Sequence, residues 1–178
     1  MLYLLDGYET ERLVFRLLKP DDFDDWLPLF KNRDASKFVG LDKIHTPKKR
    51  CDAWFERVFD RYENDLGGMN VLVDKKLNCM IGQCGLLVQQ VDGKEELEVG
   101  YSILPAFWNK GYATEAAIRC KEAAFLNDYA QSLVSIMHVE NNKSKKVALK
   151  NGMHLEKSIT YRGMPIDVFR IDKQKLFI

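Results

Sequence analysis

The sequence predicts an α+β domain built around one sheet. Stretches of alternating or continuous apolar residues, bounded by turn signals, interleave with stretches whose apolar residues recur at helical spacing. In chain order the pattern is strand, helix, helix, three strands, helix, strand, helix and two strands. The 178 residues, 46% of them hydrophobic and 30% charged, suit a single domain over residues 1–178 with a sizeable core.

The first third of the chain predicts one strand and two helices. Residues 11–18 alternate as a strand does, and Pro20 with the aspartates after it favours a helix start. A second helix is expected to begin near Thr46 and to end at Gly67 and Gly68. Its buried stripe is expected to consist of Cys51, Trp54, Phe55, Val58, Phe59 and Tyr62.

Three strands are predicted next, at residues 69–74, 80–91 and 95–104. Turn signals separate them at Lys75–Asn78 and at Val91–Lys94.

The remaining elements alternate between helix and strand before a final hairpin. Gly152 favours the end of a short helix. The predicted elements are a helix at 114–126, a strand at 132–139, a helix at 144–151, and strands at 155–161 and 166–171.

The composition argues against several classes of function. A formal net charge of +1 gives no electrostatic footprint for nucleic acid. No apolar run could span a membrane, and none resembles a signal peptide, so we expect a cytoplasmic protein. Neither a disulfide nor a metal site is expected, because the cysteines show no paired spacing and have no histidine nearby: Cys51, Cys79, Cys84 and Cys120.

The turn between the strand at 95–104 and the helix at 114–126 predicts an anion site. Gly111 can adopt positive φ, and without a Cβ it lets a ligand approach the backbone. Thr114 is a good helix N-cap, and the first N–H groups of a helix attract phosphate. The alternative interpretation is that Gly111 only shapes a tight loop.

Three segments of the chain resemble one known family: Thr10–Asp22, Glu98–Ala116 and Asn141–Met153. They are similar, in order and spacing, to the GCN5-related N-acetyltransferases (GNAT). Within that family they resemble the branch that acetylates ribosomal-protein N-termini and spermidine. The resemblance covers nearly the whole chain. It implies a mixed, mostly antiparallel sheet of about seven strands with about four helices, split between the fourth and fifth strands.

The sequence departs from the family pattern at three positions. Trp108 stands where the broad pattern has Gln or Arg, although Gly111 and Ala113 fit it, and we interpret the tryptophan as a mark of the branch. Ala148 replaces a tyrosine, the commonest general acid of the family, and Met153 replaces a phenylalanine.

The resemblance implies that acetyl-CoA enters the split as a co-substrate, with no metal. The turn at 109–114 would hold the pyrophosphate, and Asn141 would lie near the pantetheine arm. One lysine among Lys143, Lys145 and Lys146 would approach the 3′-phosphate. Lys110 would help as a point charge or be plain solvated surface. The residues expected to bind acetyl-CoA are Ile103, Leu104, Trp108, Asn109, Lys110, Gly111, Tyr112, Ala113, Thr114, Asn141, Ser144 and Lys146.

Acetyl transfer to an amine needs a base, because a free amine near neutral pH is mostly protonated. Glu98 is the expected base; the alternative is a solvent-facing strand residue paired with a lysine. Ser144 is favoured as the proton donor to the leaving thiolate, although it also suits the N-cap of its helix. Tyr101 is a weaker candidate. A backbone N–H near 102–104 would stabilise the oxyanion.

The acceptor remains open between a protein N-terminus and a small-molecule amine. Its site is expected to be lined by residues 37–46, the second helix and the hairpin at 161–167, where Arg162 and Asp167 contact an acceptor or stabilise the hairpin. A polyamine acceptor would favour an acidic cleft, and four aspartates form an acidic cluster: Asp21, Asp22, Asp24 and Asp25. The simpler interpretation is that they are the negative start of a helix.

Two other functions compete with acetyl transfer. One is a non-catalytic acyl-CoA-binding or sensing domain on the same fold. The other, a nucleotide-binding phosphate loop, lacks either common glycine-rich motif. The protein is expected to be a monomer or a homodimer.

Overall fold

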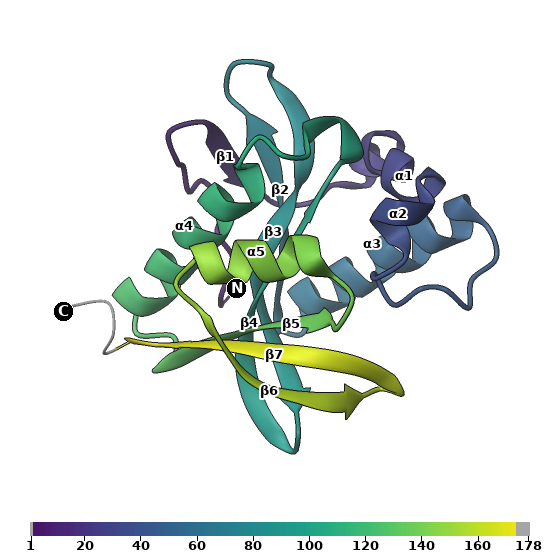
Figure 1. Ribbon diagram of the computed structural model, residues 1–178. Helices are drawn as coiled ribbons and strands as arrows, with labels where there is room; N and C mark the ends of the chain where they lie inside the picture. Colours follow the sequence, from purple (N-terminus) through teal and green to yellow (C-terminus); the bar gives the residue numbers. More distant parts are fainter. Residues whose placement is uncertain (1, 174–178) are drawn as a thin grey trace.

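The computed structural model of the protein describes residues 2–173, which form a seven-stranded sheet (Figure 1). The strands lie in the order β1-β2-β3-β4-β5-β7-β6, and neighbours are antiparallel except for the parallel pair β4 and β5. The expected mixed, mostly antiparallel sheet is confirmed. The strands are β1 (Leu13–Arg16), β2 (Gly67–Asp74), β3 (Cys79–Val91), β4 (Lys94–Ile103), β5 (Ser132–His138), β6 (His154–Tyr161) and β7 (Met164–Asp172).

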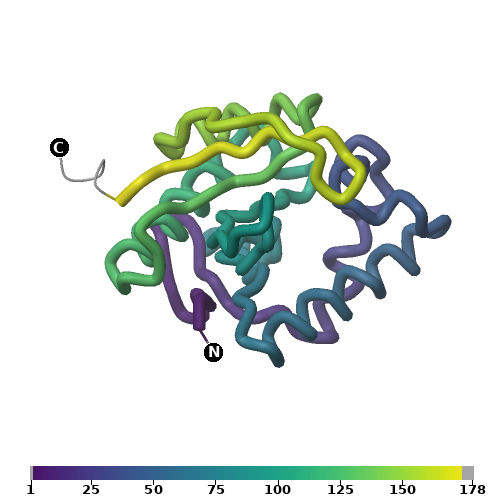
Figure 2. Tube along the Cα trace, turned by 90° about the horizontal axis from the view of Figure 1, so that it is seen from below, coloured from purple at the N-terminus to yellow at the C-terminus, as the bar shows by residue number. Residues whose placement is uncertain are grey.

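Helices pack against both faces of this sheet. Within the described residues they are α1 (Phe23–Lys31), α2 (Arg33–Ser36), α3 (Pro47–Glu63), α4 (Tyr112–Leu126) and α5 (Asn142–Lys150). Adjacent residues of β2 point to opposite faces, as strand geometry requires. Leu72 lies in the core beneath α4 and α5, and Val71 lies in the core beneath α1 and α3. Figure 2 shows the β6–β7 hairpin, in yellow, curving across toward α1–α3, in purple to blue.

The starts of two helices differ from the prediction. Helix α4 begins at Tyr112, because Gly111 takes the N-cap position with φ 83° and its carbonyl accepts from the N–H of Glu115. Thr114 therefore lies inside the first turn and is not the cap. Helix α5 begins at Asn142, because the Asn141 side chain caps it by accepting from the N–H of Ser144. The expectation that Ser144 is an N-cap is therefore wrong.

Helix α2 was not expected from the sequence. It is only four residues long, too short to show a helical repeat, and Asn32 caps it by accepting from the N–H of Ala35. The end of α3 also differs: the helix stops at Glu63, and Gly67 and Gly68 begin strand β2.

The sheet splits between β4 and β5. The Glu98–Val134 pair joins these strands in the described structure, whereas β5 pairs with β7 along its whole length. The side chain of Ser135 adds a bond to the carbonyl of Val99 at 2.8 Å. Beyond this point the two strands diverge, so an edge of β4 is left open toward β5.

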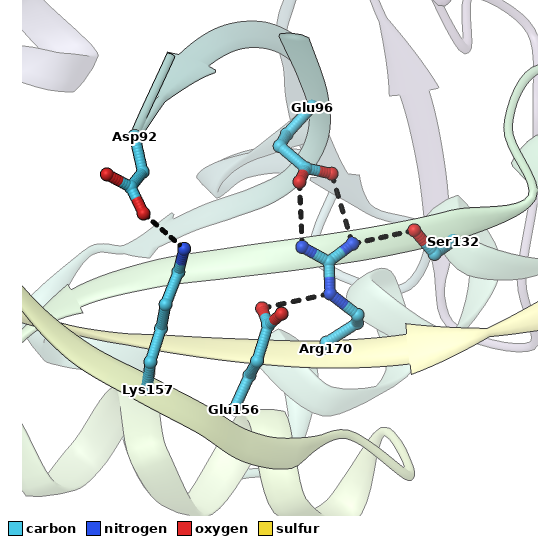
Figure 3. A network of polar contacts seen from close by, with 6 residues as sticks. All are labelled: Asp92, Glu96, Ser132, Glu156, Lys157 and Arg170. Carbon is cyan, nitrogen blue, oxygen red and sulfur yellow. Dashed lines mark hydrogen bonds and ion pairs between the residues drawn. The ribbon is translucent and has the colours of Figure 1, made fainter. Parts of the chain in front are cut away.

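Charged side chains join the two halves of the sheet near the starts of β4 and β5, where the split is closed (Figure 3). Arg170 on β7 donates to both carboxylate oxygens of Glu96 on β4, at 3.1 and 2.7 Å. It also donates to Glu156 on β6 at 2.9 Å and to Ser132 on β5 at 2.7 Å. One guanidinium thus connects four strands where β4 and β5 begin, and the split between β4 and β5 opens away from it.

Two further features bear on function. Within residues 2–173 no helix is long and apolar enough to cross a membrane, and no cluster of His, Cys, Asp or Glu side chains could hold a metal ion. The four cysteines are free thiols, although the sulfurs of Cys84 and Cys120 lie 3.5 Å apart in the core.

Candidate active site

A cleft of about 960 Å³ fills the split between β4 and β5. We name its two regions by the helices that line them. The α4 end is formed by the loop at 108–111, the first turn of α4 and helix α5. The α3 end is formed by residues 34–39, one face of α3 and the β6–β7 turn. Glu98 and Tyr101 line the cleft from β4, between these two regions.

At the α4 end the backbone adopts the left-handed conformation twice, at Asn109 (φ 61°) and at Gly111 (φ 83°). These turns lead directly into α4, whose first N–H groups have no partner within the helix. A Cβ placed on Gly111 would lie 3.4 Å from the Nη2 atom of Arg12, so the glycine also leaves room for that guanidinium. The loop thus presents free N–H groups and the positive end of a helix dipole to an anion.

A network around Glu115 fixes the loop. Its carboxylate accepts from the hydroxyl of Thr10 at 2.5 Å and from the Nε of Arg12 at 2.6 Å, and Arg12 also donates to the carbonyl of Lys110 at 3.0 Å. Burial by itself raises the pKa of Glu115, but the hydrogen bonds from Thr10 and Arg12 outweigh it and hold the pKa below its ordinary value. The network thus ties the first turn of α4 to the N-terminal segment.

Trp108 links the loop to both walls of the cleft. Its indole N–H donates to the carbonyl of Ile103 at the end of β4, at 2.7 Å. On the opposite wall, the Nζ of Lys143 on α5 lies 3.5 Å from the centroid of its ring, a cation–π contact. The tryptophan that departs from the broad family pattern therefore has a positional role of its own.

Glu98 is partly buried and bonded to uncharged neighbours. Its carboxylate accepts from the side-chain amide of Gln89 at 2.8 Å and from the N–H of Ile136 at 3.4 Å. Burial raises the pKa of Glu98, although these bonds and the charges of Arg61 and Arg162 oppose the rise. The alternative of a solvent-facing carboxylate paired with a lysine is therefore wrong.

The other two catalytic candidates lie next to each other. The hydroxyl of Tyr101 donates to the backbone carbonyl of Ser144 at 2.9 Å, and burial raises the pKa of Tyr101. Within residues 2–173 the hydroxyl of Ser144 has no hydrogen-bond partner, and the residue lines the cleft. Ala148, where the family has its tyrosine, is fully buried in the core, so that position offers the cleft no proton donor.

Two residues assigned to acetyl-CoA lie outside the cleft. Leu104 is buried in the core beneath α3, and its N–H donates to the carbonyl of Ile81, so it is unavailable to an oxyanion. Lys110 is not among the lining residues, and its Nζ lies over the ring of Phe107, 5.2 Å from the centroid. The other assigned residues line the cleft: Ile103, Trp108, Asn109, Gly111, Tyr112, Ala113, Thr114, Asn141, Ser144 and Lys146.

The α3 end contains residues that the sequence did not single out. Arg57 and Arg61 lie one helical turn apart on α3 and line the cleft together with Arg162. Their spacing of four residues was the available signal, because it places both on one helix face. Asp167 instead forms an ion pair with Lys145 at 2.6 Å and accepts from Ser158, so it stabilises the hairpin.

Comparison with known proteins identifies this arrangement. The model of the acetyltransferase (GNAT) domain matches residues 12–154. The chain belongs to the GNAT acetyltransferase family. A relative, the uncharacterized protein YkkB of Bacillus subtilis (strain 168), is 34% identical over 161 residues, which cover 90% of this chain and 92% of YkkB.

Solved structures of GNAT proteins share the fold. The ribosomal L7/L12 α-N-protein acetyltransferase RimL, solved with coenzyme A, superposes with a TM-score of 0.75 at 13% identity, covering 95% of this chain and 97% of RimL. The spermidine N-acetyltransferase of Vibrio cholerae, solved with CoA and spermine, superposes with a TM-score of 0.73 at 18% identity, covering 95% of this chain and 100% of the Vibrio chain. The branch suggested by the sequence is thus represented among the structural neighbours.

Proposed function

We propose that this GNAT protein transfers an acetyl group from acetyl-CoA to a primary amine, by direct attack of the amine on the thioester. One observation carries the proposal: an anion-binding loop and a partly buried carboxylate, Glu98, line a single cleft along the open edge of β4. Acetyl-CoA bound in this cleft would have its phosphates at the α4 end and its acetyl carbon near Glu98.

The residues at the α4 end fit the donor. The backbone from Asn109 to Gly111 has the conformation of an anion-binding turn, and the first turn of α4 adds N–H groups. Lys143 and Lys146 line the same end and offer positive charge to a phosphate. Successive residues of a strand point their N–H groups to opposite edges, and the N–H of Leu104 faces β3. The N–H groups of Tyr101 and Ile103 therefore face the open edge, where the amides of a pantetheine arm can pair with them.

The reaction then needs few groups beyond those that position the two substrates. The ammonium loses one proton to Glu98, and the nitrogen lone pair forms a bond to the thioester carbon. The C–S bond breaks, the sulfur takes up a proton, and the nitrogen loses its second proton. The products are an N-acetyl amide, CoA thiol and one released proton.

Ser144 is the proposed donor of the proton to sulfur. Its hydroxyl lines the cleft and has no partner among the described residues, whereas the hydroxyl of Tyr101 already donates to a carbonyl. Tyr101 is therefore proposed to position the first turn of α5, not to donate the proton.

Calorimetric titration of acetyl-CoA, followed by measurement of thiol release with a panel of amines, tests the proposal. Gly111→Asp places a carboxylate where the pyrophosphate is expected, and it should weaken acetyl-CoA binding at least about tenfold. Gly93→Asp is the matched control, because Gly93 also has positive φ (74°) and has open space around it. An equal loss of acetyl-CoA affinity in both variants would overturn the donor site, as would the absence of acetyl-CoA binding to folded wild-type protein. Binding without thiol release across the panel would favour the non-catalytic alternative.

A further inference from the structure

Positive side chains gather at the α3 end of the cleft. Lys37, Arg57, Arg61 and Arg162 line it from three separate segments of the chain. The carboxylate that lines the same end is Asp34, and Glu98 follows between the two ends. Further charged lining residues lie toward α5: Glu140, Lys143, Lys146 and Lys150. The whole chain carries a net charge of only +1, so this excess is local.

Arg57 and Arg162 form no ion pair with a described residue, although Glu98 lies near enough to Arg61 and Arg162 for their charges to interact. Arg57 forms no ion pair or hydrogen bond with any residue in 2–173, and Arg162 contacts only the ring of Tyr161, with 5.0 Å between its Cζ and the centroid. Arg61 uses Nη2 to donate to the carbonyls of Leu66 and Val88, at 2.6 and 2.7 Å, and its Nε is buried without a partner.

Bringing these guanidinium groups together is unfavourable unless an anion joins them. Burial and the charge of Arg162 lower the pKa of Arg57. Burial also lowers the pKa of Arg61; the charge of Glu98 opposes this, and the charges of Arg162 and Arg57 add to it. Guanidinium groups match the geometry of carboxylate and phosphate, to which they donate two parallel bonds. The site therefore has the chemistry of an anion-binding pocket that faces Glu98.

Resting on the acetyl transfer proposed above, we propose that the acceptor is a primary amine that carries a carboxylate or phosphate group a short distance from its nitrogen. The amine lies at Glu98 and the anionic group lies between Arg57 and Arg162. The spacer is short, because Arg162 lies near enough to both Arg57 and Glu98 for their charges to interact within one cleft. The side chains of Phe38, Trp54 and Val58 line the same end and provide an apolar wall for the spacer.

This charge pattern also acts on the amine itself. Nearby positive charges disfavour an ammonium group, so the arginines promote loss of its proton to Glu98. A polyamine, which would bring further positive charge among the arginines, is rejected for the same reason. Acceptors are thus selected by their negative charge.

The test compares amines with the same three-carbon spacer. The probes are 4-aminobutanoate, 3-aminopropylphosphonate, butylamine and 1,3-diaminopropane, each assayed for thiol release from acetyl-CoA. We expect kcat/KM to be at least about tenfold higher for an anionic probe than for butylamine, and lowest for the diamine. The ranking of the carboxylate and phosphonate probes decides between these two anions.

Two sets of variants locate the effect. Arg57→Gln with Arg162→Gln should lower kcat/KM for the anionic probes at least about tenfold more than it lowers kcat/KM for butylamine. Lys48→Gln with Lys49→Gln is the matched control, because it removes the same charge from exposed positions on α3 that do not line the cleft. Equal rates for the diamine and the anionic probes, or an unchanged preference in the arginine variant, would overturn the inference.

A binding measurement separates this inference from the proposed reaction. The probe 3-aminopropylphosphonate is titrated by calorimetry into wild-type and arginine-variant protein saturated with CoA. Specific binding that is lost in the variant supports the anionic acceptor even if no probe is acetylated, a result that would count against acetyl transfer alone. Binding equal in both proteins would overturn the anionic acceptor whatever the acetylation rates are.

Discussion

The two ends of the cleft differ in how fully their polar groups are already bonded. At the α4 end Arg12, Glu115 and Trp108 each have partners within the protein, and the backbone is held in one conformation. At the α3 end Arg57 and Arg162 face the cleft without a carboxylate partner in residues 2–173. In the proposed reaction, the first end is preorganised for one unchanging donor, and the second leaves side-chain charge for the acceptor to satisfy.

Glu98→Gln should give the largest effect, because it removes the base that serves the α3 end. General-base catalysis is typically worth about 10²–10⁴ in rate, and we expect kcat/KM to fall within that range while acetyl-CoA binding is kept. Loss of acetyl-CoA affinity in this variant would contradict the division between the two ends.

The pH profile of the same variant sharpens this assignment. The base works only when ionised, and burial raises the pKa of Glu98. The wild-type kcat/KM should therefore fall as pH decreases through a pKa above the ordinary glutamate value, and this acid limb should be absent in Glu98→Gln. Because the folded state favours the protonated form, stability should decline as pH rises through the same interval in wild type only, as measured by urea unfolding.

Glu115→Ala should act on the α4 end alone. It leaves Arg12 and Thr10 without their shared acceptor and frees the loop, so acetyl-CoA should bind about tenfold more weakly and the free energy of unfolding should drop by about 1–3 kcal/mol. The control is Glu122→Ala on the same helix, whose pairing with Arg119 is on the surface and should contribute at most about 0.5 kcal/mol. Calorimetry and thermal unfolding measure both effects, and an unchanged affinity would show that the network does not set the loop.

Ser144→Ala should give a smaller loss. The thiolate of CoA leaves readily, so a proton donor contributes less than the base, and kcat should fall about fivefold with both Michaelis constants kept. Ser144→Thr keeps a hydroxyl and should recover most of the rate. A normal rate in Ser144→Ala would remove this residue from the chemistry.

Tyr101→Phe should have the smallest effect. It removes one hydrogen bond to the carbonyl of Ser144, worth about 0.5–1.5 kcal/mol, and affects the cleft only through the position of α5. We expect a change in kcat of about twofold and a small decrease in melting temperature. A loss larger than that of Ser144→Ala would instead make the tyrosine the proton donor.

The sequence predicts the α4 end better than the α3 end, for a physical reason. The loop around Gly111 is a local motif, in which strand, turn and helix follow one another in the chain. Arg57 and Arg162 are about a hundred residues apart, and only the tertiary fold brings them to one cleft. No local pattern marks that meeting.

Errors in the prediction come from competition between residues of similar propensity. Thr114 and Ser144 both suit an N-cap by residue type. Gly111, three residues earlier, occupies the N-cap position of α4, and the Asn141 side chain caps α5. Lys110 looks suited to a phosphate by its place in the chain, yet its side chain lies over Phe107. Side-chain direction within a turn depends on backbone angles that the sequence does not specify.

The cluster around Arg170 has a consequence for how the cleft can open. The two halves of the sheet meet at the Glu98–Val134 pair and at this cluster, and both lie on the closed side of the split between β4 and β5. We therefore expect the cleft to widen by rotation about that side, with a stiffness that depends on a guanidinium that lines no part of the cleft. In the proposed reaction, a substitution of Arg170 should then change the rate at which CoA departs without removing a contact to either substrate.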